Sequence, residues 1–302
     1  MNGSFTVTFW GVRGSHPAPG AQTVGVGGNT TSVEVRAGNH VVILDAGTGV
    51  IGLGRALVSQ HRADKKPITA NVFFTHTHHD HTQCFPFFVP LYFKTTTLYI
   101  FGPKSLHEDL EVLARAMVPP VFPIGLGELP CLRVVRNLLE SEVVVLDANG
   151  EEPRVFAEHR EPLPESPQAV FVRVMRSYAH PHGLLVYRIE YDGKAMVMAT
   201  DTECYVGGDQ RLIRFVRGAD LLLHDAQYTE AEYASPVAPT QGWGHSTWQM
   251  AVEVARAARV QRLALVHHDP AHDDAMLERL EQEAQAAFPQ AFLAREGMKI
   301  EL

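Results

Sequence analysis

The sequence predicts an α+β fold in which β-sheets are layered and flanked by helices. Its composition, 45% hydrophobic and 20% charged over 302 residues, is that of a globular chain with ample length to bury a core. The first half reads as short strands separated by glycine-rich turns, and the last third alternates strands with helices. We therefore expect one domain that covers residues 1–302.

Four strands are predicted in the first quarter of the chain. The first two alternate along their length, and the other two are continuous apolar runs, as expected of strands buried on both faces. In order they are Thr6–Trp10, Ser32–Arg36, Val41–Leu44 and Asn71–Thr75. A helix is expected from about Leu106, where Ser105 and Glu108 fit a capping box.

The second half has a more regular pattern of three strands, two helix–strand pairs, a last helix and a short strand. In order they are Val170–Met175, Leu184–Tyr191, Ala195–Ala199, Gln210–Val216, Leu221–His224, Thr247–Ala258, Leu263–Val266, Asp274–Ala287 and a strand near Met298. The preceding residues, about 119–167, are rich in proline and have little periodicity beyond the strand-like Val143–Leu146. We expect this segment to be an irregular excursion from the core.

The charge balance argues against a long polyanion as partner. Lys and Arg number 26 against 34 Asp and Glu, a net charge of −8, so no general positive field would attract RNA or DNA. No window approaches the roughly eighteen consecutive apolar residues of a membrane span. The N-terminus lacks the charged and apolar segments of an export signal. These features predict a cytoplasmic protein without a membrane partner.

A histidine-rich motif follows the strand Asn71–Thr75. It has the pattern H-x-H-x-D-H, made of His76, His78, Asp80 and His81. On a strand, residues two apart share a face, so His76 and His78 would meet at one point, and a turn would bring Asp80 and His81 to a second point nearby. Imidazole and carboxylate suit Zn²⁺, Mn²⁺ or Fe, and two such ions can share a phosphate or a carbonyl. A chance cluster would arise in only about two chains per thousand at these residue frequencies, so the motif predicts a metal site.

Further ligands are expected where other strands begin or end. The candidates are His180 or His182, Asp201, and His267 or His268. Each of them, taken singly, could equally be a capping or surface residue. Asp201 suits a bridging role because a carboxylate has two oxygens and can contact both ions.

With these motifs the chain resembles the metallo-β-lactamase-fold hydrolases, whose fold is a four-layer αββα sandwich of two mixed β-sheets flanked by helices. Leu44-Asp45-Ala-Gly-Thr-Gly is similar to the first motif of the family and Thr-His-Thr-His-His-Asp-His to the second. His180, Thr200-Asp201 and His267 match the third, fourth and fifth motifs. The resemblance implies two divalent ions, with Zn²⁺ preferred to Mn²⁺ or Fe. It assigns one ion to His76, His78 and His180, the other to Asp80, His81 and His267, and the bridge to Asp201.

The segment Gly242-Trp243-Gly244-His245-Ser246-Thr247 resembles the RNase Z-like branch, which includes tRNA 3′-end endonucleases and cyclic-nucleotide phosphodiesterases. Ser246 and Gln249 fit a capping box, which would place His245 just before a helix; a loop histidine is the alternative. The resemblance implies that a metal-bound hydroxide attacks the substrate, that Asp80 orients or deprotonates this water, and that His245 protonates the leaving oxygen. Asp45 and Asp225 would fix imidazole tautomers or, alternatively, cap strand ends.

Three other segments allow weaker predictions. Two glycine-rich loops, at residues 11–17 and 27–32, would border the active site. Arg13 in the first loop could hold a phosphate, although plain turn chemistry is an equal alternative. The aromatic stretch Phe85–Phe93 is expected to pack in the core or at a subunit contact, with a base-stacking wall as the minority interpretation.

The choice of substrate depends on residues 119–167. They contain four arginines against nine acidic residues, whereas tRNA endonucleases of this branch usually carry a basic arm. The sequence therefore predicts a dinuclear-metal phosphodiesterase for a small phosphodiester such as a cyclic nucleotide. A tRNA 3′-processing endonuclease and an acyl or lactone hydrolase on the same metal site are the alternatives. A homodimer is expected from the resemblance alone.

Overall fold

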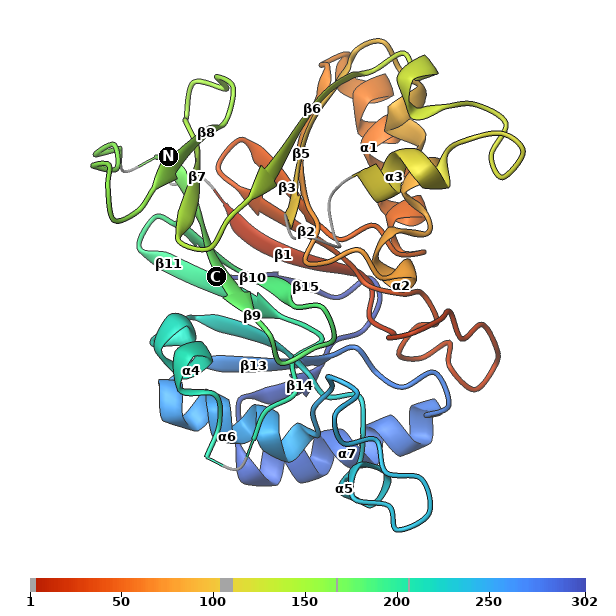
Figure 1. Cartoon of the computed structure of the whole chain (residues 1–302), viewed down its shortest axis with the longest axis vertical. Helices are drawn as coiled ribbons and strands as arrows, with labels where there is room; N and C mark the ends of the chain where they lie inside the picture. The colour runs from red at the N-terminus through yellow and green to blue at the C-terminus, as the bar shows by residue number, and fades with distance from the viewer. Residues whose placement is uncertain (1–3, 104–110, 167, 206) are drawn as a thin grey trace.

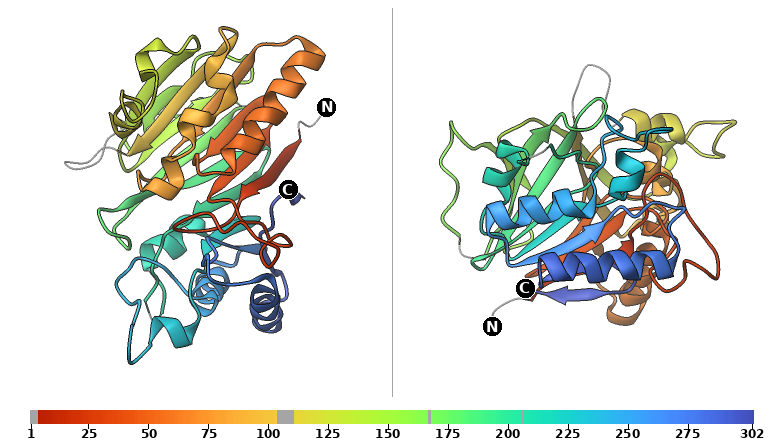
Figure 2. Two further views of the ribbon diagram at one scale, coloured as in Figure 1. Left: turned by 90° about the vertical axis from the view of Figure 1, so that its right-hand side faces the viewer. Right: turned by 90° about the horizontal axis from the view of Figure 1, so that it is seen from below.

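The computed structural model describes residues 4–103, 111–166, 168–205 and 207–302. Two mixed β-sheets lie face to face between two layers of helices (Figure 1). The α1 and α3 layer covers one sheet, and the α4, α6 and α7 layer covers the other (Figure 2). This is the αββα sandwich that the sequence predicts.

The first sheet has seven strands in the order β15-β1-β2-β3-β4-β5-β6. Strands β3 to β6 run parallel to one another, and the pairs β15–β1, β1–β2 and β2–β3 are antiparallel. The strands are β1 (Phe5–Gly11), β2 (Ser32–Ala37), β3 (His40–Leu44), β4 (Ile68–Phe73), β5 (Thr96–Pro103), β6 (Leu132–Leu138) and β15 (Lys299–Glu301).

The second sheet has eight strands in the order β14-β13-β12-β11-β10-β9-β7-β8. Strands β11 to β14 are parallel, and the remaining pairs are antiparallel. The strands are β7 (Glu142–Leu146), β8 (Arg154–Ala157), β9 (Val170–Ser177), β10 (Leu184–Tyr191), β11 (Lys194–Ala199), β12 (Leu221–Asp225), β13 (Arg262–Val266) and β14 (Ala291–Leu293).

Helices connect and cover these strands. They are α1 (Val50–Asp64), α2 (His79–Thr82), α3 (Glu111–Ala116), α4 (Gln210–Val216), α5 (Glu230–Tyr233), α6 (Trp248–Ala258) and α7 (Asp274–Ala287), with short 3₁₀ turns η1 (Phe85–Phe87), η2 (Val89–Tyr92) and η3 (Leu126–Glu128). The predicted helix start at Leu106 and its cap, Ser105 with Glu108, lie outside the described residues. No helix in the described ranges is long and apolar enough to cross a membrane.

The two largest apolar clusters of the described residues stabilise the sandwich. The larger one fills the space between the sheets, where Val7 and Phe9 of the first sheet share a core with Val172 and Val186 of the second. The smaller one lies under α1. It contains Phe85, Phe88 and Leu91 of the aromatic stretch Phe85–Phe93, each almost fully buried. These three residues are core, as the preferred interpretation of that stretch predicts.

Residues 119–166 are an irregular excursion only in part, and the strand expected at Val143–Leu146 is present as β7. They form β6 at one edge of the first sheet, and β7 and β8 at one edge of the second. An edge strand needs a partner on one side only and can leave side chains in solvent, so its apolar pattern is weak. Leu132 and Val135 of β6, for example, remain 59% and 49% exposed.

Candidate metal centre

The candidate site lies where parallel strands of both sheets end. Asp45 follows β3, Asp201 follows β11, and His267 follows β13, each with its backbone in the left-handed region. Non-glycine residues rarely adopt this conformation, and residues held in it cluster at functional sites. Two hydrogen bonds join the sheets here, from the Leu185 amide to the Thr75 carbonyl and from the Tyr187 hydroxyl to the Phe74 carbonyl.

Three histidines form one half of the site, which we call the imidazole triad. His76, His78 and His180 each place a ring nitrogen within 4.8 Å of the others. The Nε2 of His180 lies 2.9 Å from the Nδ1 of His78. His182, the alternative to His180, is exposed and outside the triad. The expected strand geometry is wrong in one respect, because β4 ends at Phe73 and the two first histidines converge from a loop.

Four buried residues form the other half, which we call the carboxylate cluster. Asp80, His81, Asp201 and His267 have ligand atoms within 4.8 Å of one another. The Nε2 atoms of His81 and His267 each lie 3.2 Å from Asp80 and 3.2 Å from Asp201. The expected turn after His78 is the single-turn helix α2, which carries Asp80 and His81.

Asp201 lies between the two halves, and His268 lies outside both. The Oδ1 of Asp201 lies 3.7 Å from the Nε2 of His76 and 4.0 Å from that of His180, so one carboxylate faces both groups. His268, the alternative to His267, directs its Nε2 to the Ala294 carbonyl at 3.2 Å and takes no part in the cluster.

Side chains next to the carboxylate cluster form hydrogen bonds with the Nδ1 atoms of its two histidines and so orient the rings. Asp45 accepts from the Thr75 amide and lies 2.8 Å from the Nδ1 of His81. Gln227 Oε1 lies 2.9 Å from the Nδ1 of His267. Asp45 therefore orients an imidazole and braces the backbone, which combines both interpretations offered for it. Gln227 was not predicted from the sequence, where its only signal is its position two residues after Asp225.

His245 lies beside both halves. Its Nδ1 is 2.8 Å from Asp225, and its ring stacks on that of His267 with centroids 4.9 Å apart. A ring nitrogen lies within 4.8 Å of ligand atoms of His180 and Asp201. The segment is not a simple loop, since α6 starts three residues later.

The residue predicted to cap α6 is wrong. Thr247, not Ser246, accepts the capping hydrogen bond, from the Met250 amide. Ser246 instead donates to the Thr202 carbonyl and accepts from the Cys204 amide, so its hydroxyl joins this loop to the loop of Asp201.

The first glycine-rich loop borders the site and the second is hydrogen-bonded to it, but Arg13 does not hold a phosphate, which was one of its two expected roles. The Ser15 amide donates to Asp80 at 2.9 Å, and Gly14 packs so closely on His267 that a Cβ would lie 2.4 Å from its ring. The Arg13 side chain is fully buried and donates to the carbonyls of Gly27, Asp269 and His272. Arg13 therefore braces the loops and is not placed to bind a phosphate.

Comparison with known families agrees with this geometry. Residues 40–268 match the family model described as the β-lactamase superfamily domain. The chain belongs to the β-lactamase superfamily. It is a hydrolase of this superfamily, with the metallo-β-lactamase fold.

Individual relatives resemble this superfamily member over nearly its whole length. Ribonuclease Z of Thermoplasma acidophilum is 26% identical over 329 aligned residues, covering 100% of this chain and 98% of the relative. The metallo-β-lactamase-fold protein YhfI of Bacillus subtilis has the same fold, with a TM-score of 0.66, 19% identity and coverage of 99% and 100%. The short form of human tRNase Z has a TM-score of 0.61, 21% identity and coverage of 98% of each chain.

The charge state of the hydrolase's centre differs between its halves. Burial alone would lower the pKa of His267, but Asp201 and Asp80 raise it to about 9. Burial would raise the pKa of Asp80, but His81 and His267 hold it far below the usual range. In the imidazole triad, burial lowers the pKa of His180 to about 4. Protons on His81 and His267 therefore compensate the carboxylates when no ion is bound.

The residues present fit divalent ions. The Nε2 atoms of His76 and His81 are buried, and among the described residues neither has a hydrogen-bond partner. Buried polar atoms without partners are rare, and here they face carboxylates within a group of imidazoles. Nitrogen and carboxylate oxygen are the donors that Zn²⁺, Mn²⁺ and Fe²⁺ accept.

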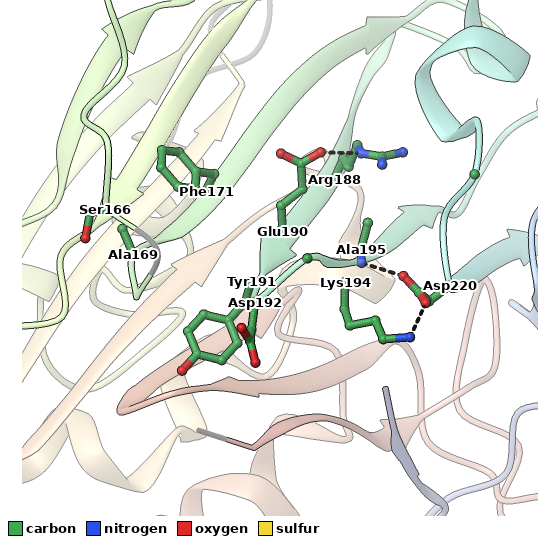
Figure 3. A pocket seen from close by; sticks show the side chains of 12 residues that line it. Ser166, Ala169, Phe171, Arg188, Glu190, Tyr191, Asp192, Lys194, Ala195 and Asp220 are labelled. Carbon is green, nitrogen blue, oxygen red and sulfur yellow. Dashed lines mark hydrogen bonds and ion pairs between the residues drawn. The ribbon is translucent and has the colours of Figure 1, made fainter. Parts of the chain in front are cut away.

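A second pocket of the hydrolase lies at the opposite end of the second sheet, around the β10–β11 turn (Figure 3). Strand β11 separates it from Asp201 by about 20 Å. Four of its charged residues form two ion pairs, Arg188 with Glu190 at 2.7 Å and Lys194 with Asp220 at 2.8 Å. It offers no group for the chemistry of the metal centre.

Proposed function

We propose that this superfamily member hydrolyses phosphodiester bonds at a centre of two divalent ions. The observation that carries this proposal is the His245–Asp225 pair, held at 2.8 Å beside both ligand groups. Such a pair can protonate a departing alkoxide oxygen, the poor leaving group that a phosphodiester of a ribose or an alcohol releases.

The seven residues of the imidazole triad and the carboxylate cluster would hold the ions, with Asp201 between them. We propose Zn²⁺ first, and Mn²⁺ or Fe as alternatives. Such ions lower the pKa of a bound water and neutralise the charge of phosphate oxygens. The remaining steps depend on side chains of this chain.

Asp80 and His245 divide the proton transfers in this proposal. Asp80, oriented by the Ser15 amide, positions the attacking water and accepts its proton. Asp225 fixes the Nδ1 of His245, which leaves Nε2 to donate a proton to the departing oxygen. Such donation is typically worth about 10² to 10⁴ in rate.

RNA is the first candidate substrate, which reverses the preference drawn from the sequence alone. Relatives named Ribonuclease Z align with this chain from end to end, and the solved structure of a tRNase Z shares its fold. We therefore place 3′-end processing of a tRNA precursor ahead of cyclic-nucleotide hydrolysis.

A small phosphodiester is the second candidate, favoured by the charge of residues 119–167. Arg154 is paired with Asp147 at 2.6 Å, and Arg133 donates to the carbonyls of Leu129 and Cys131. These arginines are thus engaged within an acidic segment, which would hinder tight binding of long RNA. A homodimer stays a prediction.

Turnover by metal-loaded protein tests the proposal. The substrates are a tRNA precursor with a 3′ extension, a cyclic nucleotide and bis(p-nitrophenyl) phosphate. Salt-sensitive cleavage of the precursor would favour RNA, and cleavage of the cyclic nucleotide alone would favour the second candidate. Absence of phosphodiester turnover with two ions bound would contradict the proposal and favour acyl or lactone hydrolysis.

The His245→Gln variant tests the proton donor. We expect a loss of about 10²- to 10⁴-fold on substrates with an alkoxide leaving group and a much smaller loss on p-nitrophenyl esters, whose leaving group needs no proton. Ion content should be unchanged, which elemental analysis checks. Equal losses on both kinds of substrate would assign His245 a structural role.

A further inference from the structure

Three strongly exposed aromatic side chains lie close in sequence to residues of the metal centre. Tyr178 is 70% exposed, Tyr205 64% and Trp243 63%. Tyr178 precedes His180 by two residues, and Trp243 precedes His245 by two. Single exposed aromatic residues are normal on a protein surface, but three that flank one catalytic centre call for a specific explanation.

The loops that carry these residues are joined to one another at the centre. The Glu203 amide donates to the Ala179 carbonyl, which joins the loop of Tyr205 to the loop of Tyr178. The Glu203 carboxylate accepts from the Gly242 and Gly244 amides at 2.8 and 2.9 Å, on both sides of Trp243. The buried Glu203 thus connects all three loops.

Close packing also fixes the Trp243 loop to the imidazole triad. Gly244 has φ +91°, and its carbonyl lies 3.1 Å from the Nδ1 of His180. A Cβ at this position would lie 2.1 Å from that same nitrogen, so only glycine allows the approach. Trp243 is therefore presented at the border of the centre on a held loop, while its side chain stays in solvent.

Tyr178 and Tyr205 extend the same border. The Arg176 guanidinium lies 5.4 Å from the ring centroid of Tyr178, which orders that ring. Tyr205 lines a cavity of about 320 Å³ together with Thr247 and Met250 at the start of α6, the helix that follows His245. Tyr178 and Trp243 thus lie on the loops that carry His180 and His245, and Tyr205 lies on the loop that follows Asp201.

We propose that Trp243 and Tyr178, with Tyr205 beyond them, form a platform on which a nucleobase of the substrate stacks. This inference rests on the proposed function and names its substrate class: a phosphodiester that carries a base next to the scissile bond. Stacking is tolerant of sequence and needs no excess of positive charge, which suits a chain with net charge −8. Phe85 and Phe88 of the aromatic stretch Phe85–Phe93 are buried, so these two rings cannot stack on a nucleobase.

A pair of matched substrates tests the platform. Thymidine 5′-(p-nitrophenyl phosphate) carries a base, and methyl p-nitrophenyl phosphate has the same leaving group without one. We expect Trp243→Ala to raise KM for the thymidine ester about tenfold and to leave the methyl ester unchanged. Trp243→Phe should restore most of the affinity, and Tyr178→Ala should have a smaller effect of the same kind. An equal change for both esters, or none, would overturn the platform.

Fluorescence separates this inference from the proposed function. Cytidine 5′-monophosphate, which offers no diester to cleave, should quench the emission of the metal-loaded wild type. The quench should be absent in Trp243→Phe, which retains Trp10 and Trp248 as internal controls. If the protein hydrolyses neither these esters nor the tRNA precursor and cyclic nucleotide named above but shows this quench, the proposed function fails and the platform stands. If it hydrolyses the esters without any quench or KM difference, the platform fails and the proposed function stands.

Discussion

The two halves of the metal centre lie side by side but differ in charge and in how their rings are held. In the carboxylate cluster, side chains of Asp45 and Gln227 hold the Nδ1 atoms of His81 and His267. In the imidazole triad, His180 is held by a backbone carbonyl and His78 is only half-buried. Burial lowers the pKa of His180 to about 4, whereas carboxylates raise that of His267 to about 9.

This difference shows that burial alone does not determine the charge of a histidine. Both rings are withdrawn from water, but only His267 has two carboxylates at 3.2 Å to stabilise its proton. The carboxylate cluster should therefore bind the first ion more tightly and exchange protons for it, and the triad should bind the second ion without proton release.

The largest effect is expected from the residue that both halves share. Asp201→Asn removes the carboxylate that faces both groups, so we expect loss of at least one ion and a fall in turnover of about 10³-fold or more. Elemental analysis and initial rates measure this. Asp220→Asn is a matched control, because Asp220 is also buried and hydrogen-bonded but lies at the far end of β11. If Asp201→Asn still bound two ions and kept full activity, the claim that both halves share the Asp201 carboxylate would be contradicted.

A smaller and one-sided effect is expected from Asp45→Asn. The amide no longer offers two acceptor oxygens to Thr75 and to the Nδ1 of His81, so the His81 ring is less well oriented. Ion affinity of the carboxylate cluster should fall about 10- to 100-fold, while that of the triad stays the same. Competition with a chelator of known affinity measures both sites. Equal weakening at the two sites would show that the halves are not independent.

The last effect is graded with pH. An ion must displace the protons of His81 and His267, so affinity of the carboxylate cluster should rise by up to about a hundredfold per pH unit until pH about 9. The triad should show no such rise, because His180 is already neutral well below neutral pH. Chelator competition across this range measures both slopes, and parallel slopes would contradict the comparison.

The proton of His267 also affects the stability of the ion-free protein. The folded pKa of His267 lies above the unfolded value of about 6.5, so the stabilisation is complete below pH 6.5 and is lost as pH rises through about 9. Melting temperatures of chelated protein should fall over this window, whereas those of loaded protein should not. A fall of the same size in both forms would exclude His267 as its cause.

Local patterns were sufficient for much of the fold and for half of the site. The helices Gln210–Val216 and Asp274–Ala287 and the strand Leu184–Tyr191 have the predicted bounds, because their periodicity agrees with their burial. Helix α1 was not predicted, since Gly52 and Gly54 weaken its pattern. Gly54 is required by packing, because a Cβ would lie 2.9 Å from the Phe88 ring.

The sequence by itself determined where a candidate metal centre lies, because His76, His78, Asp80 and His81 lie within six consecutive residues and one turn of chain brings them together. Only the tertiary structure decided between His180 and His182 and between His267 and His268. Those choices depend on where strands far apart in the sequence end and on one backbone rotation at each end, which no local pattern encodes. The same reason applies to Arg13. Two of its hydrogen-bond acceptors, the carbonyls of Asp269 and His272, lie more than 250 residues away in the sequence, and these bonds make Arg13 a buried brace.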